Sequence, residues 1–179
     1  MSSPGCSPTV RKETLHTVSL VRPHLGPGTS VLDVGCGEGW VADEIARESA
    51  AEVAVVDVVD IRRTHGLPFS LYDGVHLPFP DNRFSAVVCF TMLHHVPSPS
   101  LQDRLFAQAC RVLRPGGVFA GTDSQSSWRF RLIHLFDTMV VVDPKTLPQR
   151  LRAAGLTEVR VDVDQSLRFR AVKPHLEQR

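Results

Sequence analysis

The sequence lacks the features that mark membrane-spanning, secreted and metal-binding proteins. No apolar run approaches the ~20 residues of a membrane-spanning helix, and residues 1–8 have no apolar centre of the kind found in signal peptides. The cysteines lack the close spacing of metal ligands; they are Cys6, Cys36, Cys89 and Cys110. We therefore expect a cytoplasmic protein with no membrane contact and no metal site, whose cysteines are reduced and whose residues 1–8 are disordered.

The sequence also lacks a large excess of one charge, an internal repeat and a nucleic-acid-binding motif. The net charge is +1 over 179 residues, of which 42% are hydrophobic, as is usual for one globular domain. The first half is more acidic, which suits a cationic ligand, and the second half is more basic, which suits an anionic partner; ordinary solvated surfaces are the simpler explanation of both. We expect a single domain over residues 1–179 and no nucleic-acid partner. The sequence does not distinguish a monomer from a homodimer.

Residues 31–39, with the sequence VLDVGCGEG, join a short apolar run to three glycines at alternate positions. A helical pattern follows directly, so this stretch predicts a strand, a tight turn and a helix. Open α/β sheets bind nucleotides with this arrangement, at the carboxyl end of a strand. Glycine lets the backbone turn sharply and approach a ligand closely.

The third glycine of the dinucleotide-binding pattern G-x-G-x-x-G is missing, because position 40 is Trp40. Asp33 and Glu38 also flank the turn, and two carboxylates would repel a pyrophosphate. A ligand that carries a sulfonium and an ammonium group but no phosphate suits these charges better. The turn therefore favours S-adenosylmethionine over NAD.

Acidic residues stand at the ends of the first three predicted strands, where ligands of open α/β sheets gather. Besides Asp33, these are Asp57 and Asp73. Asp57 could accept hydrogen bonds from ribose hydroxyls, a role for which Asp60 is a rival, and Asp73 could accept one from an adenine amino group. Turn formation and helix capping are the alternative roles of each carboxylate.

Apolar runs and turn residues divide the chain into alternating strands and helices, which predicts an α/β sheet with a final antiparallel hairpin. The predicted strands are 30–34, 52–59, 69–72, 84–90, 118–122, 157–163 and 167–172, and the predicted helices are 9–24, 41–46, 101–113 and 144–154.

Five motifs follow one another in a fixed order: VLDVGCGEG at 31–39, VVD at 55–57, YDGVHLPFPDNRF at 72–84, TMLHHV at 91–96 and RVLRPGG at 111–117. Together they resemble the class I S-adenosylmethionine-dependent methyltransferases, specifically the methyltransferase type 11 group that includes quinone-biosynthesis enzymes. The resemblance implies a Rossmann-like seven-stranded sheet, mostly parallel with a C-terminal antiparallel hairpin. It also implies methyl transfer from S-adenosylmethionine to a small organic acceptor.

The resemblance further implies a set of cofactor-binding residues. The glycine turn would hold the methionine side, Asp57 the ribose, Asp73 with Gly74 the adenine, and Phe90 with Thr91 the sulfonium. The implied residues are Asp33, Gly35, Cys36, Gly37, Gly39, Asp57, Asp73, Gly74, Phe90 and Thr91. One departure is Ser85, which follows Phe84 where the family usually has Asp; it could weaken the anchoring of a loop without abolishing cofactor binding.

His94 and His95 are the candidate catalytic residues, because they follow the fourth predicted strand, near the transferred methyl group in this fold. Methyl transfer depends mainly on alignment and exclusion of water, and a general base is needed only if the acceptor must lose a proton. Either histidine could be that base, and either could instead pack against the core or shape the pocket. The sequence does not separate the two.

Residues 124–142 form an aromatic and basic insertion on the acceptor side. Its aromatic side chains, Trp128, Phe130 and Phe136, are expected to cover or line the acceptor pocket. Arg129 and Arg131 could bind an acidic acceptor or only face solvent, and His134 could face the acceptor. Two other functions stay open: a methyltransferase-like module that binds cofactor or a partner without catalysis, and an RNA or protein methyltransferase.

Overall fold

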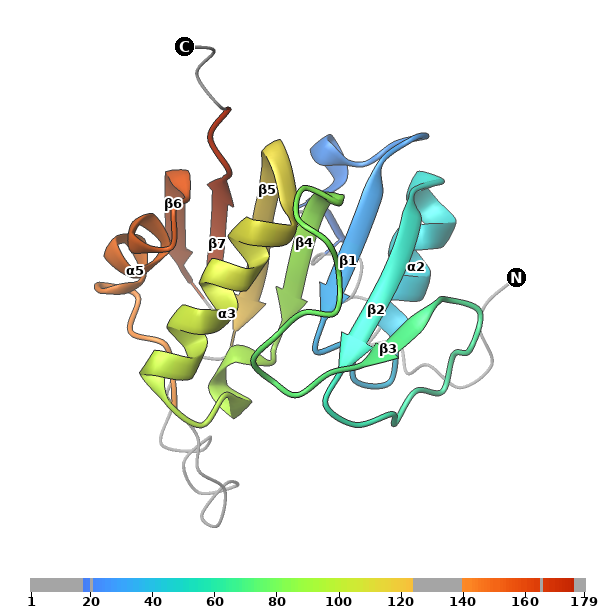
Figure 1. Cartoon of the computed structure of the whole chain (residues 1–179), viewed down its shortest axis with the longest axis horizontal. Coiled ribbons are helices and arrows are strands. Elements are labelled where there is room, and N and C mark those ends of the chain that lie inside the picture. The colour runs from blue at the N-terminus through green and yellow to red at the C-terminus, as the bar shows by residue number, and fades with distance from the viewer. Residues whose placement is uncertain (1–17, 20, 124–139, 165, 176–179) are drawn as a thin grey trace.

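The computed structural model describes residues 18–19, 21–123, 140–164 and 166–175, which form a seven-stranded sheet with helices on both faces (Figure 1). The strand order is β3-β2-β1-β4-β5-β7-β6. The strands are β1 (Ser30–Val34), β2 (Glu52–Asp57), β3 (Phe69–Leu71), β4 (Phe84–Phe90), β5 (Leu113–Asp123), β6 (Thr157–Val163) and β7 (Leu167–Val172). The helices are α2 (Trp40–Ser49), α3 (Pro99–Val112) and α5 (Leu147–Ala153), with 3-10 helices η1 (Arg22–His24) and η2 (Leu93–His95).

The sheet has its topological switch point between β1 and β4. From β1 the chain proceeds outward through β2 to β3 and then returns to β4, which pairs with the other side of β1. Strands β1 to β5 are parallel, and β7 runs antiparallel to both β5 and β6. The predicted fold class and the final hairpin are therefore confirmed. In such sheets the ligand crevice lies outside the carboxyl ends of the two strands at the switch point.

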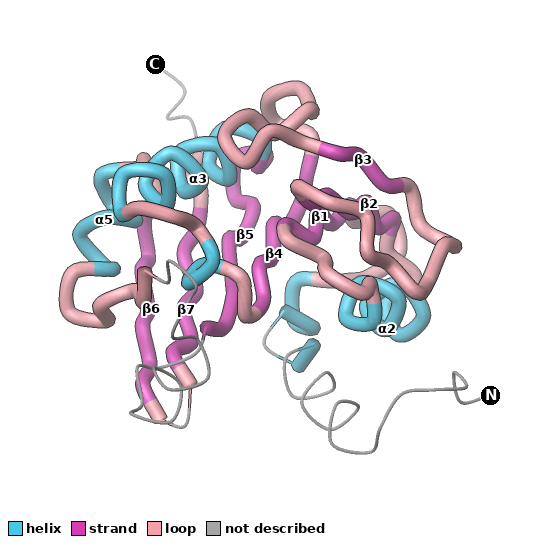
Figure 2. The backbone as a smooth tube through the Cα atoms, turned by 90° about the horizontal axis from the view of Figure 1, so that it is seen from below, coloured by secondary structure: helices cyan, strands magenta, loops and turns pink. Residues whose placement is uncertain are grey.

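Both faces of the sheet are covered, α2 lying on one and α3 with α5 on the other (Figure 2). Alternate residues of β1 accordingly belong to two separate cores: Leu32 and Val34 pack on the side of α3 and α5, and Val31 packs on the side of α2. Because both faces are buried, the central strands are continuous apolar runs. This explains why the sequence predicts the bounds of β1 and β4 correctly.

The predicted bounds of β2, β3, β5, α2, α3 and α5 are wrong by one or more residues. Strand β2 ends at Asp57, because the apolar residues Val58 and Val59 that follow it are exposed. Strand β5 begins at Leu113, where backbone pairing with β4 starts before the predicted position. Helix α3 begins at Pro99, since Ser98 accepts the N-cap hydrogen bond from the Leu101 N–H.

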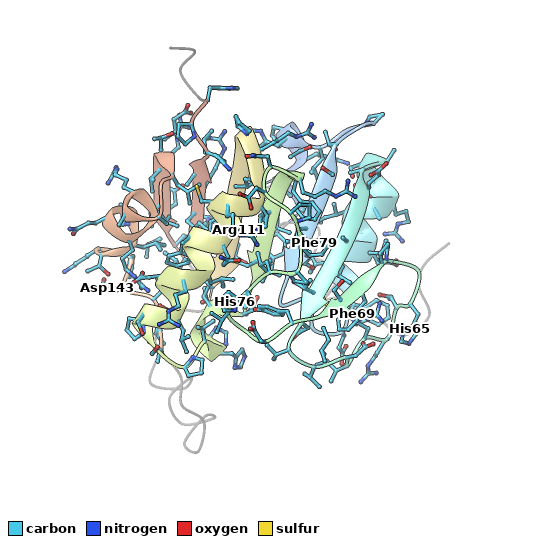
Figure 3. All side chains as sticks on the ribbon, in the orientation of Figure 1. His65, Phe69, His76, Phe79, Arg111 and Asp143 are labelled. Atoms are coloured by element: carbon cyan, nitrogen blue, oxygen red, sulfur yellow. The ribbon has the colours of Figure 1, made fainter. Side chains whose placement is uncertain are left out.

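The loop between β3 and β4 is fixed by Arg111 of α3. Its guanidinium donates to the carbonyl oxygens of Leu77 and Phe79, at 2.9 and 2.8 Å, and pairs with Asp81 at 2.8 Å. Arg111 and Phe79 are labelled in Figure 3. Both residues lie in motifs that carry the family resemblance, so part of that resemblance serves the fold.

Several predictions lie outside the described residues. They concern residues 1–8 and the part of the aromatic insertion from 124 to 139. Within the described ranges no helix is long and apolar enough to cross a membrane, and no group of three potential metal ligands comes together. The single domain and the cytoplasmic location stay predictions.

Candidate cofactor and catalytic site

The glycine turn, residues 35–39, is folded against the carboxyl end of β2. The N–H groups of Gly35 and Cys36 donate to the carbonyl oxygen of Val56, at 2.9 and 3.2 Å. The N–H of Gly37 donates to Oδ2 of Asp57 at 2.8 Å. Asp57 therefore holds the turn in place from the neighbouring strand.

All three glycines of the turn have positive φ, which side chains with a Cβ disfavour. Their surroundings differ. A Cβ at Gly35 would lie 2.8 Å from the side chain of Met92, and one at Gly39 would strike Thr64, whereas one at Gly37 would have no described atom within 4 Å. The turn is thus closed by protein at both ends and open at its centre, where a ligand can approach the backbone.

Asp33 carries a buried carboxyl group beside the glycine turn. Its exposed fraction is 2%, and its Oδ1 has no hydrogen-bond partner among the described residues. Burial, together with the negative charge of Asp57, raises the pKa of Asp33 to about 7. A buried carboxylate oxygen without a partner is costly, so this position fits a ligand that brings a cationic group.

Glu38 contributes less to the site than the sequence suggested. Its carboxylate pairs with Arg63 at 3.0 Å and accepts a hydrogen bond from the indole N–H of Trp40 at 2.9 Å. The repulsion of a pyrophosphate predicted from two flanking carboxylates therefore rests on Asp33 and Asp57.

Asp57 remains better suited to a ribose than Asp60. Its two oxygens accept from the N–H groups of Gly37 and Val58, and each carboxylate oxygen can accept a second hydrogen bond. The hydrogen bond from Arg62 lowers the pKa of Asp60 to about 2, and that guanidinium holds both Asp60 oxygens at 2.9 Å. The ribose role of Asp57 stays a prediction.

Asp73 forms a turn, which was its alternative role. One of its oxygens accepts from the N–H groups of Val75 and His76, and the other is 2.9 Å from the His76 ring. These hydrogen bonds hold the pKa of Asp73 well below its usual range. Asp73 lies two residues beyond β3 and is exposed, and its adenine role with Gly74 stays a prediction.

Phe90 and Thr91 lie where β4 leaves the sheet. Phe90 is the buried last residue of the strand. Thr91 has φ of 55°, a left-handed conformation that is rare for a β-branched residue, and its N–H donates to the carbonyl of Thr122 at 2.8 Å. Backbone strain of this kind collects at functional sites, although the predicted contact with a sulfonium is not tested.

Cys36 does not act as a nucleophile in this environment. Burial, followed by the charges of Asp33 and Asp57, raises the pKa of its thiol to about 12. The thiol therefore stays protonated near neutral pH, and it is the backbone of Cys36 that shapes the turn.

The two histidines, which the sequence could not separate, have different environments. His94 is 3% exposed and its Nδ1 is hydrogen-bonded to Oδ1 of Asp123, the buried last residue of β5. His95 is exposed, and its ring lies 4.1 Å from that of His94 between centroids. A carboxylate at Nδ1 orients the imidazole and places its basic lone pair on Nε2. The geometry thus favours His94 as the base.

Asp123 was not predicted as a site residue. The available signal was its position, because it closes a predicted strand as Asp57 does. Its partner, His94, is distant in sequence and comes close only in the folded sheet. The aromatic and basic candidates of the insertion, residues 128–136, lie outside the described residues.

Known proteins of similar sequence are methyltransferases. The family described as "Methyltransferase domain" matches residues 9–161. A ubiquinone biosynthesis O-methyltransferase of Xylella fastidiosa is 32% identical over 157 residues, which cover 72% of this chain and 61% of the relative. A sterol 24-C-methyltransferase of Yarrowia lipolytica is 35% identical over 105 residues, covering 52% of this chain and 27% of the relative. The chain thus spans less than two thirds of the length of these curated relatives.

Solved structures share the fold at low sequence identity. A phosphoethanolamine N-methyltransferase of Haemonchus contortus in complex with S-adenosylmethionine has a TM-score of 0.78 at 17% identity, over 94% of this chain and 54% of that one. A Haloferax volcanii methyltransferase solved with the Trm112 activator has a TM-score of 0.76 at 18% identity, over 93% of each chain. At these identities the likeness supports the fold alone.

Proposed function

Because the chain belongs to the methyltransferase domain family, we propose that it transfers a methyl group from S-adenosylmethionine to a small organic acceptor. The observation that carries this proposal is the glycine turn, which is open at Gly37 and lies above the buried Asp33. The relatives named above act, by their names, on a sterol and in ubiquinone biosynthesis. These names support a small-molecule acceptor.

The described residues fit the cofactor in charge and in shape. Asp33 offers a buried carboxylate to the ammonium group, and the backbone at Gly37 can come close to the ligand because no side chain intervenes. Asp57 has hydrogen-bonding capacity left for the ribose. When bound, S-adenosylmethionine supplies a methyl group that is already activated by its sulfonium.

The chain's own contribution to the reaction is alignment and proton removal. His94 would accept the acceptor's proton at Nε2, and Asp123 would stabilise the imidazolium that results. A base is useful only for an acceptor atom that carries a proton to be lost. The His94–Asp123 pair therefore favours transfer to a hydroxyl oxygen.

Release of S-adenosylhomocysteine tests the proposed function. The protein is incubated with S-adenosylmethionine and a panel of small phenols, hydroxy acids and amines. Turnover with hydroxyl compounds, and its loss in His94→Gln, is the expected result. Tight cofactor binding without release in the presence of any acceptor or cell extract would contradict catalysis and favour a cofactor-binding module.

A further inference from the structure

A cavity of about 390 Å³ lies at the amino ends of the parallel strands, opposite the cofactor site. It lies at the amino ends of β1 and β4, between η1, the first residues of β5 (114–117) and the segment after β7. Parallel strands place their amino ends on one edge and their carboxyl ends on the other, so this cavity is separated from the glycine turn by the length of the strands (Figure 1). Its lining residues are His24, Gly28, Thr29, Ser85, Arg114, Pro115, Gly116, Gly117 and His175.

The lining includes one arginine and two histidines but no Asp or Glu. Arg114 is exposed, and its guanidinium has no ion pair or hydrogen bond in the described part of the chain, whereas arginines such as Arg22, Arg62 and Arg150 each pair with a carboxylate. The donors of Arg114 are therefore available to a ligand, beside a cavity large enough for a small organic molecule.

Two further cations lie behind the lining. Arg170 donates through Nε to Nε2 of His24 at 3.1 Å. Lys173 donates to the carbonyl oxygens of Arg111 and Leu113, at 3.2 and 2.7 Å, and to the amide oxygen of Asn82. The oxygens that hold Lys173 are uncharged, and Arg170 has no carboxylate partner among the described residues, so the field at the cavity is positive.

His24 is set up as a hydrogen-bond donor by its contact with Arg170. Because an arginine nitrogen has no lone pair to offer, Nε2 of His24 accepts and the ring proton stands on Nδ1. Burial, and then the charge of Arg170, lower the pKa of His24. The neutral ring thus keeps an N–H group beside the cavity.

Backbone hydrogen bonds fix the wall of the cavity that is formed by Gly116, Gly117 and His175. The N–H of Gly116 donates to the carbonyl of Lys173 at 2.8 Å, and the N–H of Lys173 donates to the carbonyl of Gly117 at 2.9 Å. The His175 ring lies so close to Gly116 that a Cβ there would be 2.7 Å from it. This pairing keeps His175 and Arg114 on the same wall.

Ser85 connects this cavity with the one departure noted in the sequence. Its hydroxyl accepts from the N–H of Ser30 at 3.0 Å and so completes the pairing of β1 with β4. An Asp at this position would place a carboxylate in the lining. In this chain the hydroxyl keeps the lining free of negative charge.

We propose that this cavity is a second ligand site, which binds a small molecule through a phosphate monoester group. Arginine provides a planar set of donors that suits phosphate oxygens. A dianion gains more than a carboxylate from three neighbouring cations, and the volume leaves room for the organic group that carries the phosphate. The site is independent of the proposed methyl transfer.

Titration of the full chain with phenyl phosphate tests the proposal, with heteronuclear NMR of the imidazole groups and calorimetry as readouts. We expect binding that shifts the His24 and His175 signals and that persists when S-adenosylhomocysteine is saturating. Benzoate, a monoanion of similar size, should bind more weakly. Equal binding of benzoate, or displacement of phenyl phosphate by S-adenosylhomocysteine, would overturn the proposal.

Three variants locate the binding. Arg114→Gln should weaken phenyl phosphate about tenfold, the usual effect of losing a charged hydrogen bond, and Ser85→Asp should abolish binding by adding a carboxylate. Arg104→Gln is the matched control, since Arg104 is an exposed arginine of α3 outside the cavity lining. Thermal unfolding confirms that each variant is folded. Unchanged affinity in Arg114→Gln, or an equal loss in Arg104→Gln, would refute the site.

Discussion

Protonation of Asp33 should control cofactor affinity between about pH 5.5 and 7.5. In the free protein, burial and the charge of Asp57 raise its pKa to about 7 from an ordinary 3.8. The ammonium group of the ligand favours the ionised carboxylate, so binding weakens as the pH falls below 7. If only ionised Asp33 binds, a pKa of about 7 makes the dissociation constant roughly 25-fold larger at pH 5.5 than at pH 7.5.

Calorimetry with S-adenosylhomocysteine measures this effect without turnover. An α-amino group has a pKa of about 8, so the ligand stays largely protonated over this range. Asp33→Asn removes the titrating group at nearly constant volume and is expected to flatten the pH dependence. It also separates Asp33 from histidines that titrate at similar pH. A flat profile in the unchanged protein, or an unchanged slope in Asp33→Asn, would refute the reasoning.

The same pKa shift predicts the pH dependence of stability. The folded state raises the pKa of Asp33, so its contribution to the free energy of unfolding is full below about pH 4 and is lost as the pH rises through about 7. The thermal midpoint of the ligand-free protein should therefore fall more steeply over this range than that of Asp33→Asn. Equal slopes in the two proteins would contradict the shift.

The remaining predictions concern the turn, the base and a helix end. Gly37→Ala should weaken the binding of S-adenosylhomocysteine at least tenfold, as measured by calorimetry. Gly28 also has a positive φ and no described atom near its Cβ position, so Gly28→Ala is the control and should leave this affinity unchanged; equal effects of the two substitutions would mean that the turn acts through backbone strain. His94→Gln should lower kcat about 10²- to 10⁴-fold without changing cofactor affinity, and His95→Gln should change kcat much less; the reverse order would exclude the His94–Asp123 pair as the base. Ala50→Gly should raise the free energy of unfolding by about 1 kcal/mol, and with it the thermal midpoint, because Ala50 ends α2 in the left-handed conformation, with φ of 53°. A lower midpoint would contradict this.

The central strands could be predicted from the sequence because burial on both faces requires a continuous apolar run within the strand itself. Strands β1 and β4 are buried on both faces, and each is followed by a residue that breaks the apolar run, Gly35 after β1 and the exposed Thr91 after β4, so the run gives their bounds. The end of β2 could not be predicted this way, because Val58 and Val59 continue the apolar run but face solvent. Whether a residue is exposed depends on what packs against the strand, and the strand's own sequence does not determine this.

The residues of the candidate site also differ in whether the local sequence could predict them. Asp33 and the glycine turn lie within nine consecutive residues, and their charges and backbone freedom could be interpreted directly. The role of Asp123 could not be interpreted in this way, because it depends on His94, which lies in η2 after a different strand. Adjacent histidines look alike in the sequence, and only the turn of η2 buries one and exposes the other.

The most direct test of the proposed cofactor site is a crystal structure of the protein with S-adenosylhomocysteine. We predict that the ligand lies at the carboxyl ends of β1 and β4, with its ammonium group at Asp33 and its backbone contact at Gly37. A ligand bound at the opposite edge of the sheet, or one that leaves Asp33 and Gly37 untouched, would contradict this account.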